Sequence, residues 1–388
     1  MFSERTRWDL RPNRLAERLA AKRAAGVPVL DLTETNPTRA GLPYPADLLL
    51  PLSAPEALRY EPSPFGLEPA RAAVAADFAR RGFPVPIERL VLSASTSEAY
   101  AFLFKLLCDP GDDVLVPRPG YPLFEFLAAL ESVEVRTYPL VHDGEWHLDL
   151  AALRAAVSPR TRAVVVVSPG NPTGAFLKVE ERAALEALCA ERRIALISDE
   201  VFADFAFRQD GRRAASVARD GEALAFALGG LSKSCGLPQL KLAWTAVTGP
   251  AAHVSDALAR LEVVADTYLS VSTPVQVAAP TLLARREEVQ APIRDRVRTN
   301  LGALRAAMGP SCPATLLDPE GGWSAVLRVP ATRSEEERVT RLLEERDVLV
   351  HPGYFFDFPG EAYLVLSLLT PAVEFAEGTS RLLADLVL

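Results

Sequence analysis

Residues 67–248 alternate short apolar runs with segments of helical spacing, and this rhythm constrains the fold of the 388-residue chain most strongly. Some runs, such as 163–167, lack the alternation of a half-exposed strand, which predicts strands covered on both faces. Repeated βα units of this kind form an α/β fold with a mainly parallel, doubly wound sheet. The predicted strands are 91–92, 114–116, 163–167, 194–197 and 224–228, and the predicted helices are 67–81, 97–107, 121–130 and 179–192.

The pattern changes after Pro274, where one long helical segment is expected to continue to about residue 308. Further strands and helices are then expected at 323–329, 334–346, 348–350 and 363–368, followed by a last helix. This organisation predicts a large domain at 46–273 and a smaller α/β domain at 274–388. Residues 1–45 are expected to form an arm that packs on the small domain and contributes to it.

Three polar residues follow the predicted strands in a recognisable order. Asn171 lies in a Pro/Gly-rich turn at 169–174, Asp199 follows the run 194–197, and Lys233 follows the run 224–228. Ligands gather at the carboxyl ends of parallel strands, so we expect one shared site. Pyridoxal phosphate (PLP) needs an amine for a Schiff base, a carboxylate for its pyridine nitrogen and a donor beside its phenolic oxygen. Singly these residues could be a solvated lysine, a helix cap and a turn asparagine, but together they indicate PLP.

A phosphate site is predicted at Ser95, Thr96 and Ser97, which end the strand 91–92 and open the next helix. Backbone amides and hydroxyls at the positive end of a helix can cradle a phosphate dianion. A simple N-cap is the plainer interpretation of the same residues, and the two roles are compatible.

Asn171, Asp199 and Lys233, together with the segments 60–66 and 119–121, resemble the class I/II aminotransferases, which are fold-type I PLP-dependent enzymes. The resemblance covers nearly the whole chain. It implies that the large domain holds the cofactor, that the terminal segments form the small domain, and that a homodimer shares its active sites. The implied activity moves an amino group between an amino acid, or a related amine, and a 2-oxo acid.

The resemblance also implies a role for each matching residue. Lys233 would form the Schiff base and, once released, move a proton between Cα and C4′, while Asp199 would pair with the pyridine nitrogen. Asn171 would donate to the ring oxygen and help to hold the substrate. Tyr121 would stack on the cofactor ring, and Tyr60 would reach the phosphate in the other subunit.

Three positions near the expected cofactor depart from the family pattern. Lys241 stands where the family has a phosphate-binding arginine, which keeps the charge but loses the bidentate fork. Gly230 replaces a phosphate-binding serine. Phe202 replaces the tyrosine that donates to the phenolic oxygen, and losing that donor should raise the pKa of the cofactor's link to lysine.

The most consequential departure concerns the substrate. The family's carboxylate-binding arginine would fall near Val365, which instead predicts a small apolar wall. Either another cation clamps the carboxylate, with Arg39 as the candidate, or the substrate is not a standard α-amino acid. Trp323 and Tyr354, each beside a glycine, are expected to line the pocket, although either could belong to the core.

Two other functions use the same motifs. A PLP-dependent lyase, decarboxylase or synthase remains open, because the motifs bind the cofactor without selecting which bond breaks. A non-catalytic PLP-binding sensor would require a DNA-binding domain, and we expect no room for one before Leu32.

Charge and composition restrict which classes of binding partner and which cellular location we expect. The net charge of −8 argues against nucleic acid or an anionic membrane as a partner, which leaves small molecules. We expect no secretory signal in the charged first ten residues and therefore a cytoplasmic protein. The four cysteines and four histidines are widely spaced, so we predict no metal site.

Overall fold

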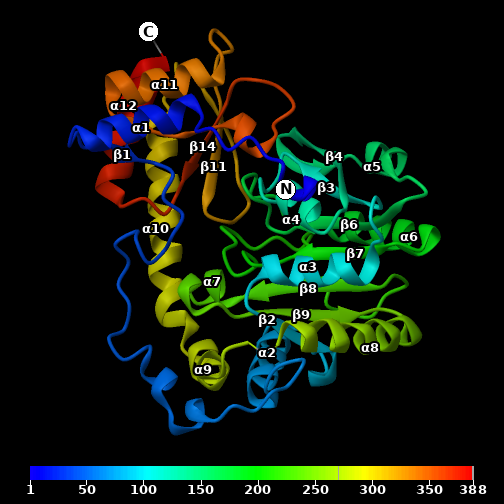
Figure 1. Cartoon of the computed structure of the whole chain (residues 1–388). Helices are drawn as coiled ribbons and strands as arrows, with labels where there is room; N and C mark the ends of the chain where they lie inside the picture. The colour runs from blue at the N-terminus through cyan, green and yellow to red at the C-terminus, as the bar shows by residue number, and fades with distance from the viewer. Residues whose placement is uncertain (270, 387–388) are drawn as a thin grey trace.

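An eight-stranded mixed sheet forms the centre of the computed structural model, which describes residues 1–269 and 271–386 (Figure 1). Its strand order is β2-β9-β8-β7-β6-β3-β4-β5, with parallel pairing from β8 through β4. The strands are β2 (Leu90–Ser93), β3 (Asp113–Arg118), β4 (Glu134–Asp143), β5 (Glu145–Leu148), β6 (Thr161–Val167), β7 (Ala195–Asp199), β8 (Ala225–Gly230) and β9 (Ala243–Thr248). The prediction of a mainly parallel α/β sheet is therefore confirmed.

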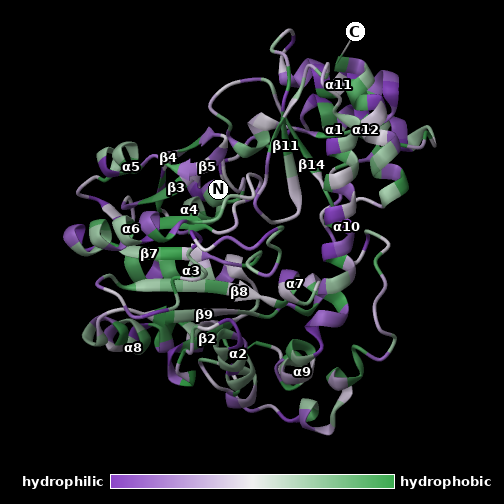
Figure 2. Cartoon of the chain, turned by 180° about the vertical axis from the view of Figure 1, so that it is seen from behind, coloured by the Kyte–Doolittle hydropathy of each residue, from purple (hydrophilic) through white to green (hydrophobic). Residues whose placement is uncertain are grey.

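Helices cover both faces of this sheet, as its unalternating strands require. Val164 and Val166 of β6 pack into one core, whereas Ala163 and Val165 pack into another on the opposite face. The strands are correspondingly hydrophobic in Figure 2. The surrounding helices are α2 (Glu68–Arg80), α3 (Thr96–Leu107), α4 (Phe124–Leu130), α5 (Leu150–Ala156), α6 (Val179–Arg192), α7 (Leu231–Ser234) and α8 (Ala251–Tyr268).

A second, four-stranded antiparallel sheet has the order β10-β11-β14-β13. Its strands are β10 (Thr315–Leu317), β11 (Ser324–Arg328), β13 (His351–Pro352) and β14 (Tyr363–Ser367). Helices α11 (Glu335–Arg346), α12 (Ala372–Leu386) and α1 (Arg14–Ala24) lie beside it in Figure 1. The strands β1 (Leu30–Asp31) and β12 (Val348–Leu349) form a separate parallel pair, which ties the N-terminal segment to this region.

The helical segment predicted from Pro274 to about residue 308 is two helices, not one. Helices α9 (Thr273–Ala284) and α10 (Arg286–Ala307) meet at Arg285, so the prediction of one uninterrupted segment to residue 308 is wrong. The long α10 runs from the region of α7 toward the four-stranded sheet (Figure 1). Short 3-10 helices occur at Glu4–Thr6, Leu50–Ser53, Pro55–Leu58, Ile87–Arg89, Pro238–Leu240 and Gly353–Phe356. No helix in the described part of the chain is both long and apolar enough to cross a membrane.

Candidate active site

The predicted site residues follow the carboxyl ends of five strands at one edge of the large sheet. Strand β2 is antiparallel to β9, and β9 is antiparallel to β8, so β2 runs in the same direction as the parallel strands. Segment 95–97 follows β2, Tyr121 follows β3, Asn171 follows β6, Asp199 ends β7 and Lys233 follows β8. Strand direction therefore brings the segments that carry these residues to the same edge of the sheet.

Lys233 lies in the single turn of α7 and is partly buried against aromatic rings. Its Nζ lies 4.7 Å from the ring centroid of Trp323 and 5.2 Å from that of Phe202. Burial lowers the pKa of Lys233 from 10.5 to about 8, although the nearby Asp199 carboxylate opposes this shift. About half of the amine would therefore be neutral at pH 8, whereas an ordinary lysine is almost fully protonated there, and the neutral form is what a nucleophilic lysine requires.

Asp199 is a buried carboxylate with two donors in contact. The Tyr100 hydroxyl donates to Oδ2 at 3.3 Å, and the backbone N–H of Val201 donates to Oδ1 at 3.2 Å. Burial raises the pKa of Asp199 to about 6, and these hydrogen bonds act in the opposite direction. Tyr100 is itself fully buried, and desolvation followed by the charge of Asp199 raises its pKa. Tyr100 was not predicted; a lone hydroxyl in the otherwise apolar stretch 99–104 was the available signal.

The Asn171 turn is joined to the end of β7. The backbone N–H of Ser168 donates to the carbonyl of Asp199 at 2.9 Å, so the turn lies beside the carboxylate strand. Asn171 is partly exposed. Its predicted role as a donor to the ring oxygen stays a prediction.

The segment 95–97 forms the first turn of α3. Ser95 is the N-cap, and its Oγ accepts from the N–H of Glu98 at 3.1 Å. The Glu98 carboxylate in turn accepts from the N–H of Ala94 at 2.6 Å. The N–H groups of Thr96 and Ser97 precede the intrahelical ladder and can serve an anion.

Aromatic residues frame the site from two sides. Tyr121 packs edge-on against Phe124, and a cleft of about 250 Å³ lies beside Tyr121 and Tyr354. The Asp199 charge adds to the effect of burial in raising the pKa of Tyr121, which places the two residues in one electrostatic environment. Trp323 is buried against Phe202, so this residue, predicted to bind substrate, lies in contact with the Lys233 side chain.

The remaining predicted residues are exposed. Tyr60 is 69% exposed, which suits a residue predicted to act in another subunit. Lys241 is exposed at the end of a short 3-10 helix, with a left-handed φ of 57°. Arg39 lies in an N-terminal loop, where its Nε contacts Glu34 Oε2 at 3.1 Å. These positions leave the roles of the three residues as predictions.

Val365 lies in the middle of β14, where the strand register determines its cross-strand neighbours. It pairs with Val326 on one side and with His351 on the other. It is buried in an apolar cluster with Trp146, Phe356 and Phe358. Val365 is therefore a buried apolar position. Its role as a wall of the substrate pocket stays a prediction.

This set of side chains fits PLP. A partly buried amine of lowered pKa, a buried carboxylate held by a tyrosine, and first-turn amides of a helix lie at or just after the ends of strands β8, β7 and β2, which point to one edge of the sheet. These are the groups that a pyridine aldehyde bearing a phosphate requires.

Comparison with known proteins identifies the family. The model of "Aminotransferase class I and II" matches residues 53–372. Glutamate-pyruvate aminotransferase AlaA of Escherichia coli K12 is 28% identical over 347 residues, covering 86% of this chain and 84% of the relative. Alanine aminotransferase of Mycobacterium tuberculosis is 28% identical over 377 residues, covering 92% and 86%.

Solved structures share the fold. An aminotransferase from Escherichia coli superimposes with a TM-score of 0.88 at 23% identity, covering 100% of this chain and 98% of that one. A double mutant of Thermus thermophilus aspartate aminotransferase gives 0.85 at 24% identity and 99% coverage of both chains. The extent of the family match and this common fold together show that the chain belongs to the class I and II aminotransferases, which are PLP-dependent enzymes.

Proposed function

We propose that this aminotransferase takes an amino group from a small amino acid or related amine and passes it to a 2-oxo acid, with PLP held on Lys233. The carrying observation is a lysine packed against two aromatic rings, with a lowered pKa, near a buried carboxylate. Bound PLP supplies an electron sink for the negative charge that forms when a proton leaves the donor carbon. Asp199 would keep the pyridine nitrogen protonated, and Thr96, Ser97 and Lys241 would hold the phosphate.

Lys233 would act as the base and acid of the reaction. With a pKa of about 8, its amine can accept the proton from the donor carbon and return it to a neighbouring carbon. The rings of Phe202 and Trp323 limit the directions in which Nζ can move and shield part of it from water. Tyr100 would support this indirectly, since its hydroxyl fixes the orientation of Asp199.

Arg39 is the proposed partner of the substrate carboxylate. Its ion-pair partner Glu34 accepts, through its backbone carbonyl, a hydrogen bond of 2.5 Å from the hydroxyl of Ser367. Ser367 ends β14, two residues after Val365, so the Arg39 loop lies against the strand where the family's arginine is missing. The carboxylate of a donor would compete with Glu34 for the guanidinium. Asn171 and Trp323 would line the same pocket.

We also propose a cytoplasmic homodimer with the three-part division 1–45, 46–273 and 274–388. Exposed apolar side chains near Tyr60, including Leu58, would be covered by a second copy. The four cysteines are free, which suits a reducing compartment.

A donor screen tests the proposed function. The PLP-loaded protein is mixed with alanine, glutamate or tyrosine, or with an amine that lacks a carboxylate, and its absorbance is followed without any added oxo acid. Stoichiometric conversion of PLP to its amine form, reversed by a 2-oxo acid, is the expected result. Persistent PLP absorbance with release of pyruvate, ammonia or carbon dioxide would contradict transamination. Conversion by carboxylate-free amines alone would remove Arg39 from the proposal.

A further inference from the structure

A buried glutamine on α10 contacts the turn that carries the reactive lysine. Gln290 is 3% exposed, and its Nε2 donates to the carbonyl of Ser234 at 2.7 Å and to Asp204 Oδ2 at 2.9 Å. Its Oε1 accepts from Arg294 Nη1 at 3.1 Å. Each polar atom of the side-chain amide therefore has a partner, which fixes its orientation.

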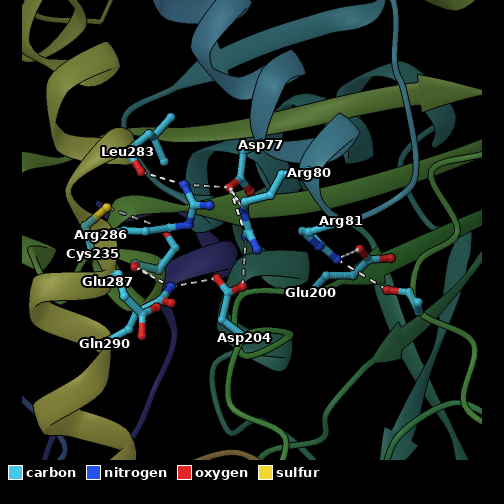
Figure 3. Close-up of polar contacts among 12 residues, drawn as sticks. Asp77, Arg80, Arg81, Glu200, Asp204, Cys235, Leu283, Arg286, Glu287 and Gln290 are labelled. Atoms are coloured by element: carbon cyan, nitrogen blue, oxygen red, sulfur yellow. Dashed lines mark hydrogen bonds and ion pairs between the residues drawn. The ribbon is translucent and has the colours of Figure 1, made fainter. Parts of the chain in front are cut away.

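Asp204 links this amide to helix α2, which packs beside the large sheet. Figure 3 shows Asp204 between Gln290 and Arg80, and Arg80 Nη2 lies 3.3 Å from Asp204 Oδ1. Arg80 also contacts Asp77, at 3.1 Å, and Asp77 contacts Arg286 of α10 at the same distance. The network thus joins α2, the segment after β7, and the first turns of α10.

The Lys233 turn needs such support because it is short. Helix α7 spans only Leu231–Ser234, and its N-cap Gly230 provides no side-chain hydrogen bond. A single helical turn is unstable alone, and its terminal carbonyls require outside partners. Ser234 Oγ donates to the carbonyl of Gly230 at 2.9 Å inside the turn, whereas Gln290 binds the Ser234 carbonyl from outside.

We propose that Gln290 is a positioning residue that holds the Lys233 amine in its reactive orientation by binding the carbonyl of Ser234. The inference rests on the proposed function. Losing this hydrogen bond would let the turn rotate and move Nζ away from the rings of Phe202 and Trp323. It would also leave the Ser234 carbonyl to find water in a buried site.

The same helix offers a matched control. Asn300 of α10 is also buried, and its Nδ2 donates to the carbonyls of Leu368 and Thr370 at 2.8 and 2.7 Å. Gln290→Leu and Asn300→Leu therefore each remove a buried amide that donates to at least one backbone carbonyl. Only the first change touches the turn of Lys233.

The test follows the half-reaction of the PLP-loaded enzyme with an amino donor by stopped-flow absorbance, as a function of donor concentration and pH. For Gln290→Leu we expect the rate at saturating donor to fall about 10-fold with the donor KM within about twofold, because a misplaced reacting group lowers the rate without weakening binding. The alkaline rise of that rate should also move up by about half a pH unit, since a looser turn lets water reach the amine. Asn300→Leu should leave this pH midpoint in place.

Several outcomes are distinguishable. Equal losses of thermal stability in both variants, with unchanged half-reaction rate and pH profile for Gln290→Leu, would overturn the positioning role. Gln290→Met, which keeps the side-chain volume, supplies the same measurement if the leucine variant does not fold. If the unmodified enzyme reacts with no donor, the proposed function fails, and that result is separate from any effect of Gln290.

Discussion

Replacing Lys233 by methionine is expected to stabilise the cofactor-free protein. The folded chain lowers the pKa of this amine from 10.5 to about 8, which means that folding disfavours the protonated form. At about 1.36 kcal/mol per pKa unit the cost at pH 7 reaches about 3 kcal/mol. Lys233 keeps some contact with solvent, and the rings of Trp323 and Phe202 attract its charge, so the expected net cost is about 2 kcal/mol.

The stability difference between Lys233→Met and the unmodified protein should depend on pH in a definite direction. Below pH 8 the folded and unfolded chains both carry the protonated amine, so the full cost is present. Between pH 8 and 10.5 only the unfolded chain binds the proton, so the stability of the unmodified protein rises with pH relative to the variant. The advantage of Lys233→Met should therefore shrink by about half or more between pH 7 and 9.5.

Urea unfolding of both proteins without PLP, at several pH values, measures this difference directly. Lys105→Met is the matched control. Burial lowers the pKa of Lys105, but the interactions with Glu131 and Tyr268 together outweigh it and hold that pKa above its usual value. That variant should be less stable than the unmodified protein at pH 7. A Lys233→Met protein that is no more stable at pH 7, or whose advantage does not change with pH, would refute the assignment of Lys233 as a desolvated amine.

Further variants separate the roles of the other site residues. Tyr100→Phe removes a hydrogen bond to buried Asp199. The loss of about 1 kcal/mol of interaction should lower the half-reaction rate about 3- to 10-fold. An unchanged rate would show that Tyr100 does not support Asp199. Lys241→Ala should weaken PLP retention by at most a few kcal/mol, measured by equilibrium dialysis, with Lys241→Arg as the charge-preserving control. If Lys241→Ala and Lys241→Arg retained PLP equally well, the phosphate would have to be bound by other residues. Arg39→Met should raise the KM of an amino acid donor while the KM of a carboxylate-free amine stays constant, and an equal rise for both would contradict a carboxylate contact.

The buried centre of the fold could be predicted from the sequence because its strands are uniformly apolar. The run 163–167 becomes β6, which is covered on both faces. Strand β4, next to the edge strand β5, was not predicted, because only one of its residues is fully buried and its sequence has no continuous apolar run. The break between α9 and α10 was missed because it falls at Arg285, whereas Pro280 and Pro292 lie inside the helices.

In the candidate site, residues with a local sequence motif could be predicted, whereas residues that act through contacts distant in sequence could not. Lys233 and Asp199 could be predicted because each follows an apolar strand in a characteristic string. Gln290 meets Ser234 across 56 positions of sequence, and Tyr100 meets Asp199 across 99, so spacing gives no sign of either contact. Such contacts depend on how α3 and α10 pack against the sheet, which only the folded chain determines.

Borohydride reduction of the PLP-loaded protein, followed by peptide mass spectrometry, tests the central claim most directly. The account predicts that one phosphopyridoxyl group becomes permanently attached to the peptide that contains Lys233, and that Lys233→Ala abolishes both this label and turnover. Labelling of a different lysine, or full turnover in Lys233→Ala, would contradict the account.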